Sequence, residues 1–212
     1  MEQWAYWLKQ RFPGWFPALE GMVRPVTLIR FGARIRYARN RATLEGGIDG
    51  QAALIRPLCP ADLDRLHAFL AEQPDGRLQY FRPHGFSRRS LRRVLASGVF
   101  LKYGLFIGDR LVAYALLKVA PTGSAFIGRL VCADYTDRGL GRFLSRYLYW
   151  QASLAGLRAR ATIHRCNLAS WRSHAAVAKF EIVTKLANDY LLIEFLPGHP
   201  EAPFLKLSDD SD

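Results

Sequence analysis

Three long apolar runs separated by tight turns constrain the fold of this chain more than any other feature. They span residues 99–107, 111–120 and 125–132, and the connections are Gly108-Asp109-Arg110 and Pro121-Thr122-Gly123. Apolar runs of this length, bounded by glycine- or proline-containing turns, are typical of strands joined by hairpins. The segment therefore predicts an antiparallel three-stranded meander, which excludes an all-helical fold.

The elements on either side of this meander predict a mixed sheet. Upstream, the pattern indicates a strand at 52–56 and helices at 61–72 and 88–96. Downstream, it indicates a helix from 139 to about 155, a strand at 158–165, a helix begun by Ser170, and strands at 180–186 and 190–195. A strand–helix–strand crossover after an antiparallel meander places helices on both faces. We expect an α/β fold of the mixed (α+β) type with a mostly antiparallel central sheet.

The two ends of the chain differ in composition from this middle region. Residues 1–50 begin with Trp4, Trp7 and Trp15, and residues 24–41 then carry six arginines and no acid. Alternation over Ile29–Tyr37 favours a strand with one cationic face, although the spacing of apolar residues fits a helix as well. The glycine-rich stretch 45–50 indicates a boundary. We therefore divide the chain into a basic aromatic extension (1–50), a domain (51–196) and a mobile tail (197–212).

Charge and cysteine content limit the partners of the protein. Thirty basic residues against 18 acidic ones give a formal net charge of +12, which attracts phosphate-rich cofactors, nucleic acid or anionic lipid. Three cysteines without CxxC spacing predict neither a disulfide framework nor a metal site, and they fit a reducing compartment. No apolar run is long enough for a membrane span. We expect a cytoplasmic protein, with peripheral membrane attachment or nucleic-acid contact through residues 24–41 as an alternative.

Residues 130–144 carry the pattern that points to chemistry. An apolar strand runs through a polar turn into a helix that opens with Gly139 and Gly141. The first turn of a helix leaves N–H groups without partners, the helix dipole adds positive charge there, and glycine lets a diphosphate approach the backbone. Arg138 and Arg142 add guanidinium donors. The segment predicts a phosphate-binding turn, with glycines chosen only for tight strand–helix packing as the alternative.

The same segment resembles the acetyl-CoA-binding motif of the GNAT N-acetyltransferase superfamily, which reads Arg or Gln, two residues, Gly, one residue, then Gly or Ala. Gly139 and Gly141 fill the glycine positions, whereas Thr136 replaces the first residue. The element order over about 51–196 also matches that superfamily. The resemblance implies that the fourth and fifth strands splay apart around acetyl-CoA. The residues it implies as contacts of acetyl-CoA are Val131, Thr136, Arg138, Gly139, Leu140, Gly141 and Arg142, with the backbone near Val131 polarising the thioester carbonyl.

The resemblance also extends downstream to Asn167 and His174. It implies that Asn167 contributes to the CoA site and that His174, seven residues later, replaces the usual tyrosine as the acid for the departing thiolate. An imidazolium with an ordinary pKa near 6.5 suits proton exchange at neutral pH. Residues 125–132 hold no glutamate to act as a base, and their only charge is Arg129.

Candidate groups for the acceptor side come from the loop 78–86. His84 is the candidate base or acceptor ligand, and Tyr80 and Arg82 are candidate acceptor-binding residues; the alternative is that His84 is a surface turn residue. Residues 77–102 contain seven basic residues and no acid, which favours an anionic acceptor. We therefore expect acetyl transfer to a primary amine of a small anionic acceptor such as an amino sugar intermediate. Alternatives are a protein, peptide or RNA acetyltransferase, and a non-catalytic CoA-fold module that binds nucleic acid or membrane.

Overall fold

The computed structural model describes residues 16–207, with side chains from residue 24 onward except that of Asp75. Within these residues nine strands form one sheet in the order β7-β8-β6-β5-β4-β3-β2-β1-β9. The strands are β1 (Leu44–Ile48), β2 (Gln51–Pro57), β3 (Phe100–Ile107), β4 (Arg110–Val119), β5 (Ser124–Val131), β6 (Arg158–His164), β7 (Phe180–Lys185), β8 (Tyr190–Phe195) and β9 (Leu205–Leu207). All neighbouring strands are antiparallel except β5–β6 and β1–β9, which confirms a mixed, mostly antiparallel sheet.

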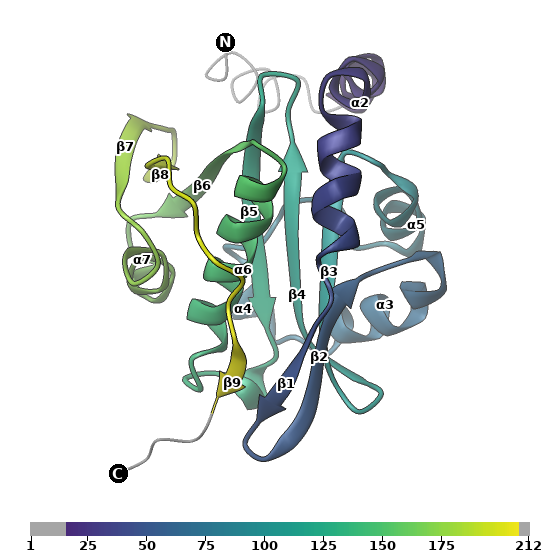
Figure 1. Cartoon of the computed structure of the whole chain (residues 1–212), viewed down its shortest axis with the longest axis vertical. Helices are drawn as coiled ribbons and strands as arrows, with labels where there is room; N and C mark the ends of the chain where they lie inside the picture. The colour runs from purple at the N-terminus through teal and green to yellow at the C-terminus, as the bar shows by residue number, and fades with distance from the viewer. Residues whose placement is uncertain (1–15, 208–212) are drawn as a thin grey trace.

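Helices cover both faces of the sheet (Figure 1). They are α2 (Phe16–Asn40), α3 (Leu63–Ala71), α4 (Asp75–Leu78), α5 (Arg88–Ala96), α6 (Leu140–Leu154) and α7 (Leu168–Ala175), with 3-10 turns η1 (Pro60–Asp62) and η2 (Ala133–Tyr135). Helices α2 and α6 lie in front of the central strands in this view, and α3 and α5 lie behind them. None of the helices within residues 16–207 is long and apolar enough to cross a lipid bilayer.

The central strands contribute side chains to two hydrophobic clusters. On β3, Leu101, Tyr103 and Leu105 face the α2–α6 side, whereas Phe100 and Phe106 face the α3–α5 side. Because both faces of these strands are buried, apolar residues occupy consecutive positions along them. This is why the three runs that predicted the meander are nearly unbroken, and why the meander prediction is confirmed.

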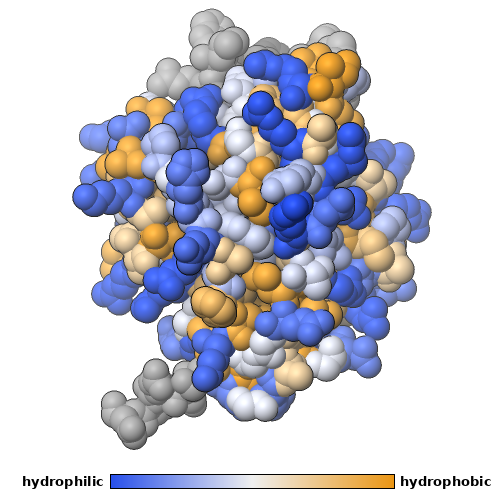
Figure 2. All heavy atoms as spheres, viewed as in Figure 1, coloured by the Kyte–Doolittle hydropathy of each residue, from blue (hydrophilic) through white to orange (hydrophobic). Residues whose placement is uncertain are grey.

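The strand predicted over Ile29–Tyr37 is wrong, because these residues belong to helix α2. Phe31, Ile35 and Ala38 are buried against the α2–α6 cluster, and their spacing of four and three residues is that of one helix face. Packing against α6 favours that face over the alternating pattern, which the same residues also satisfied. Figure 2 shows that hydrophilic side chains cover much of the surface on this side of the molecule.

The stretch 45–50, predicted to be a boundary, instead forms part of a hairpin of the sheet. Strand β1 pairs with β2 from Leu44 opposite Ile55 to Ile48 opposite Gln51. Asp49 and Gly50 connect them with φ values of 50° and 76°, as expected of a two-residue hairpin turn. The extension and the domain therefore share one sheet.

The tail expected to be mobile from residue 197 contains strand β9, which pairs in parallel with β1. Gly46 in β1 permits that contact, because a Cβ atom on it would lie 1.7 Å from the carbonyl oxygen of Leu205. Trp4, Trp7, Trp15 and the acidic end at 209–212 lie outside the described residues.

We predict that Gly46→Ala displaces β9 and lowers the free energy of unfolding by about 1–3 kcal/mol, the usual cost of overpacking. Gly47→Ala is the matched control, because a Cβ there would meet Gln51 at an ordinary 3.5 Å. Denaturant unfolding and amide hydrogen exchange at residues 205–207 measure both effects. Equal stability and equal exchange in the two variants would contradict the close contact between β1 and β9.

Candidate functional site

A gap opens between β5 and β6. These parallel strands pair only where Ser124–Phe126 lie beside Arg158–Arg160. Beyond that point β5 continues along β4 to Val131, and β6 continues along β8 to His164. The two strands diverge, and the expected splay is therefore present.

Backbone groups of β5 line one side of this gap. The carbonyl of Ser124 accepts from Ala120, and the amide of Cys132 donates to Val112, so the even-numbered residues of β5 direct their main-chain groups toward β4. Because these directions alternate along a strand, Val131 directs its N–H and C=O to the opposite side. Its carbonyl accepts from Arg77 of α4 at 2.9 Å. The Val131 amide thus faces the gap, where the resemblance places a donor to the thioester carbonyl.

The glycine turn lies at the start of α6. Gly139 is the N-cap with φ 75°, and its carbonyl accepts from Arg142 and Phe143 at 3.0 Å each. The amides of residues 139–141, which precede these first two donors, are those that a helix start leaves without intrahelical partners. A Cβ atom on Gly141 would lie 3.2 Å from Ser173 Oγ and 3.5 Å from Arg129 Nη1. Glycine at position 141 therefore lets the side chains of Ser173 and Arg129 approach the start of α6 closely. The backbone amides of this turn fit a diphosphate.

Two side chains expected to bind phosphate are already engaged. Thr136 donates its hydroxyl to the carbonyl of Ala133 at 2.7 Å, so that proton is not directed at a ligand. Arg138 forms an ion pair with Asp49 in the β1–β2 turn and lies over the ring of Tyr135. Their expected contacts with acetyl-CoA stay predictions. Sequence alone did not show that the β1–β2 hairpin packs against the turn. The backbone amides of residues 139–141 and the exposed Arg142 are the groups available to phosphate.

Arg129 is a site residue that the sequence analysis did not assign. Its Nε donates to Ser145 Oγ of α6 at 2.7 Å, and it has no carboxylate partner within the part of the chain that the structure describes. Burial lowers the pKa of Arg129 to about 10, so the guanidinium remains charged at neutral pH. The α6–α7 side of the gap is therefore positive. As the only charge in β5, Arg129 was visible in the sequence, but which helices it faced was not.

His174 lies in the protein core with an exposed fraction of 3%. Its ring packs edge-on against Phe195 with centroids 5.4 Å apart, and its Nδ1 has no hydrogen-bond partner among the described residues. Burial, and then the charge of Arg129, hold the pKa of His174 well below its ordinary value. His174 is therefore neutral at neutral pH, which corrects the expectation of an imidazolium acid.

Asn167 is the N-cap of α7. Its Oδ1 accepts from the amide of Ser170 at 3.1 Å, so the helix begins at Leu168 and not at Ser170 as expected. This use of Oδ1 leaves the amide NH₂ of Asn167 as the group able to contact a ligand. The expected CoA role of Asn167 stays a prediction.

The loop after α4 closes the other face of the gap. The Tyr80 ring lies 5.1 Å from the ring of His164 on β6. Phe81 is buried over β5, with a ring carbon 3.5 Å from where Gly128 would carry a Cβ. Residues 80–81 therefore bridge the two diverging strands, where the acceptor wall was expected.

His84 is more than a surface turn residue. Its Nδ1 donates to the Gly85 carbonyl at 2.9 Å, because a carbonyl can only accept, and its Nε2 then accepts from the Tyr114 hydroxyl at 2.9 Å. Burial is the main cause that lowers the pKa of His84, and the charge of Lys118 adds to it. His84 is thus a neutral, oriented imidazole beside β4. Arg82 of the same loop is exposed.

Metal ligation has no support among residues 16–207, which hold no group of three His, Cys, Asp or Glu residues placed to bind an ion. Cys59, Cys132 and Cys166 are free thiols.

Comparison with known proteins supplies the fold. No protein-family model and no curated protein matches the sequence. Among solved structures, the GNAT domain of S. lividans PAT is 17% identical with a TM-score of 0.64, over 73% of this chain and 97% of that one. The chain has the GNAT fold. A ribosomal-protein-S5-alanine acetyltransferase from Vibrio fischeri shares this GNAT fold at 12% identity and a TM-score of 0.60, over 80% and 99% of the two chains.

A third GNAT structure is an aminoglycoside acetyltransferase in complex with coenzyme A and kanamycin. It is 17% identical with a TM-score of 0.53, over 68% of this chain and 94% of that one. The core of the GNAT fold therefore corresponds to about two thirds to four fifths of this chain.

We predict that Gly141→Val lowers the affinity for coenzyme A at least about tenfold, because the valine side chain covers the amides and their charge-assisted hydrogen bonds to phosphate are lost. Isothermal titration calorimetry with coenzyme A measures the change. The control is Gly47→Val in β1, where a Cβ makes only an ordinary contact. Unchanged affinity in Gly141→Val would remove this turn from the site.

We predict that His174 makes stability depend on pH. Its folded-state pKa lies below the unfolded value near 6.5, so its contribution is complete above pH 6.5 and is lost as pH falls from there toward the folded-state pKa. The loss approaches about 1.4 kcal/mol per pH unit for one proton. Urea unfolding of His174→Gln should show a shallower decline in acid than the wild type, whereas the exposed His199→Gln should follow the wild type. Identical declines in wild type and His174→Gln would refute this.

Proposed function

We propose that this protein is an acetyl-CoA-dependent N-acetyltransferase. The observation that carries the proposal is the gap between β5 and β6 with the glycine-opened start of α6 beside it. One similar structure has coenzyme A and kanamycin bound, and another is named for the acetylation of a ribosomal protein. The fold thus accommodates acceptors of very different size.

The residues around the gap have separate roles in the proposed acetyl transfer. The amides of residues 139–141 and Arg142 hold the diphosphate, and the Val131 amide donates to the thioester carbonyl as negative charge develops there. The acceptor nitrogen bonds to the carbonyl carbon, the C–S bond breaks, and the thiolate takes a proton. The nearby charge of Arg129 favours the thiolate before protonation.

Proton transfer needs a donor for the thiolate and an acceptor for the amine proton. Neutral His174 can donate only from an N–H, and Ser173, which lies beside Gly141, is the second candidate donor. On the acceptor side, His84 is held neutral by burial, as a base must be, and its Nε2 faces the Tyr114 hydroxyl. The pair can pass the amine proton toward solvent.

A small anionic amine remains the proposed acceptor, such as an amino sugar intermediate. Of the seven basic residues in 77–102 that favour an anionic acceptor, three have other contacts or positions in the structure. Arg77 binds the Val131 carbonyl, Arg88 pairs with Asp64, and Lys102 lies in a different pocket. Arg82 in the loop, and the exposed arginines of α5, are the charges left to attract such a ligand. The exposed arginines of α5 are Arg89, Arg92 and Arg93.

A second candidate function is a CoA-binding module without transfer. It is favoured by the lack of a carboxylate on β5, where the sole charged side chain is Arg129. Incubation of the protein with acetyl-CoA and a panel of anionic, neutral and cationic amines separates the two functions. Thiol release that depends on an amine supports the enzyme, whereas coenzyme A binding without release with any amine supports the module.

We predict that Arg82→Ala raises KM for the acceptor roughly two- to fivefold with little change in kcat, since an exposed charge pair contributes modestly. Added salt should raise the wild-type KM in the same direction, because exposed charges are screened over about 10 Å at 0.1 M ionic strength. Steady-state kinetics measure both. Arg41→Ala, which removes a charge from the end of α2 outside the loop, is the control. Salt-independent kinetics with cationic amines as the best acceptors would contradict an anionic acceptor.

A further inference from the structure

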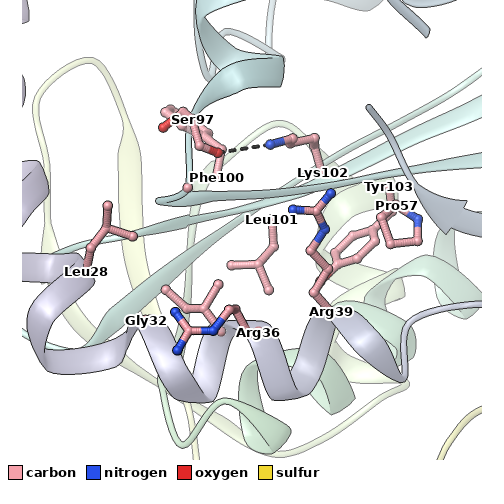
Figure 3. A pocket seen from close by; sticks show the side chains of 12 residues that line it. Leu28, Gly32, Arg36, Arg39, Pro57, Ser97, Phe100, Leu101, Lys102 and Tyr103 are labelled. Atoms are coloured by element: carbon pink, nitrogen blue, oxygen red, sulfur yellow. Dashed lines mark hydrogen bonds between the residues drawn. The ribbon is translucent and has the colours of Figure 1, made fainter. Parts of the chain in front are cut away.

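A pocket of about 280 Å³ lies outside the gap, between α2, the α5–β3 connection and the first residues of β3. Its lining includes Leu28, Gly32, Arg36, Arg39, Ser97 and Lys102 (Figure 3). None of these residues belongs to the glycine turn, to the loop 78–86 or to α7. The pocket is therefore a separate feature, to which both the N-terminal helix and the region around the start of β3 contribute.

Positively charged side chains from two elements line this pocket. Arg36 and Arg39 lie three positions apart on α2 and so share a face of that helix. Figure 3 shows the Arg39 side chain extending from α2 toward Lys102 of β3. Gly32 leaves room beside them, because a Cβ there would meet only Arg36 Nη1, at 3.6 Å.

Lys102 is the buried member of this group, with an exposed fraction of 6%. Its Nζ donates to the Ser97 carbonyl at 2.9 Å, which uses one of its three protons. Burial, together with the charges of Arg39 and Arg24, lowers the pKa of Lys102 to about 8, against a smaller opposite influence of Cys59. A buried ammonium facing other cations is costly unless an anion accompanies it.

No carboxylate supplies that anion. Within the described part of the chain, Arg36, Arg39 and Lys102 take part in no ion pair. The Arg39 guanidinium and the Lys102 ammonium match the oxygens of a phosphate, since arginine binds phosphate bidentately and lysine acts as a point charge. The Arg36 guanidinium, which lies beside Gly32 in the same pocket, adds a further positive charge. The apolar part of the lining, with Leu28 and Leu101, leaves a surface for a small organic body.

We propose that this pocket binds the dianion of a phosphate monoester through Arg36, Arg39 and Lys102. Its source is a soluble phosphorylated molecule or a phospholipid headgroup. The second source is consistent with the apolar side chains that α2 exposes beside the arginines, among them Ile29 with an exposed fraction of 85%. The site does not depend on acetyl transfer, so this proposal can be refuted without refuting the proposed enzymatic function.

The test is titration of the full chain with inorganic phosphate, against sodium chloride at matched ionic strength. Calorimetry reports affinity, and NMR of ¹⁵N-labelled lysine side chains reports the pKa of Lys102, which phosphate should raise toward 10.4. We expect Arg39→Gln to weaken phosphate binding about tenfold, because one charge-assisted contact is lost. Arg41→Gln, which removes the same charge from the end of α2 without lining the pocket, should change affinity less than about twofold.

Three further measurements make the outcome decisive. Gly141→Val, which blocks the phosphate-binding turn of α6, should keep the phosphate binding that Arg39→Gln weakens, which separates this pocket from the CoA turn. Lys102→Met, which removes the buried charge, should fold and lose phosphate binding. If the phosphate belongs to a lipid, the wild type and Arg41→Gln should co-sediment with phosphatidic acid vesicles, whereas the double variant Arg36→Gln/Arg39→Gln should not. Phosphate binding without co-sedimentation indicates a soluble phosphorylated ligand. Phosphate affinity equal to that of chloride, or equally weakened in Arg39→Gln and Arg41→Gln, would overturn the proposal.

Discussion

The short parallel contact between β5 and β6 is the constraint on which the rest of the site depends. Three residues of each strand pair, and then β6 follows β8 while β5 follows β4. Arg160 of β6 and Glu194 of β8 lie opposite each other and form a mostly buried ion pair, which ties β6 to the outer strands. Because β6 pairs with β8 beyond Arg160, the end of β5 has no neighbouring strand on that side. The Val131 carbonyl there accepts from Arg77, and the Val131 amide is left available to a ligand.

Burial decides which charges persist around the gap. Arg129 and His174 lie on the same side and both are desolvated, yet the outcomes differ because their ordinary pKa values differ by several units. The guanidinium stays charged and the imidazole becomes neutral. The result is a fixed positive potential beside a neutral histidine, an environment that favours an anionic cofactor and a departing thiolate over a cationic ligand.

The described part of the N-terminal extension, α2 and β1, packs against the rest of the molecule. Its hairpin places Asp49 against Arg138 of the glycine turn, and its helix covers the α2–α6 cluster through Phe31 and Ile35. Helix α2 also completes the phosphate pocket proposed for Arg36, Arg39 and Lys102. Changes in the extension are therefore expected to reach both the CoA turn and the remote pocket.

The sequence by itself determined the features that local interactions or continuous burial encode. The meander followed from uninterrupted apolar runs, and α5 begins where Ser87 caps it, as its side chain accepts from the Ser90 amide. The glycine-opened start of α6 was equally local. These elements appear in the structure within a few residues of their predicted bounds.

Only the tertiary structure decided what depends on contacts between distant residues. Residues 29–37 satisfied both a strand and a helix period, and packing against α6 selected the helix. The contacts of Thr136 with Ala133 and of Arg138 with Asp49 were likewise not visible in the sequence. The neutral state of His174 and the position of charged Arg129 beside the gap both depend on burial. Burial is a property of the whole packed molecule, and no local pattern of residues specifies it.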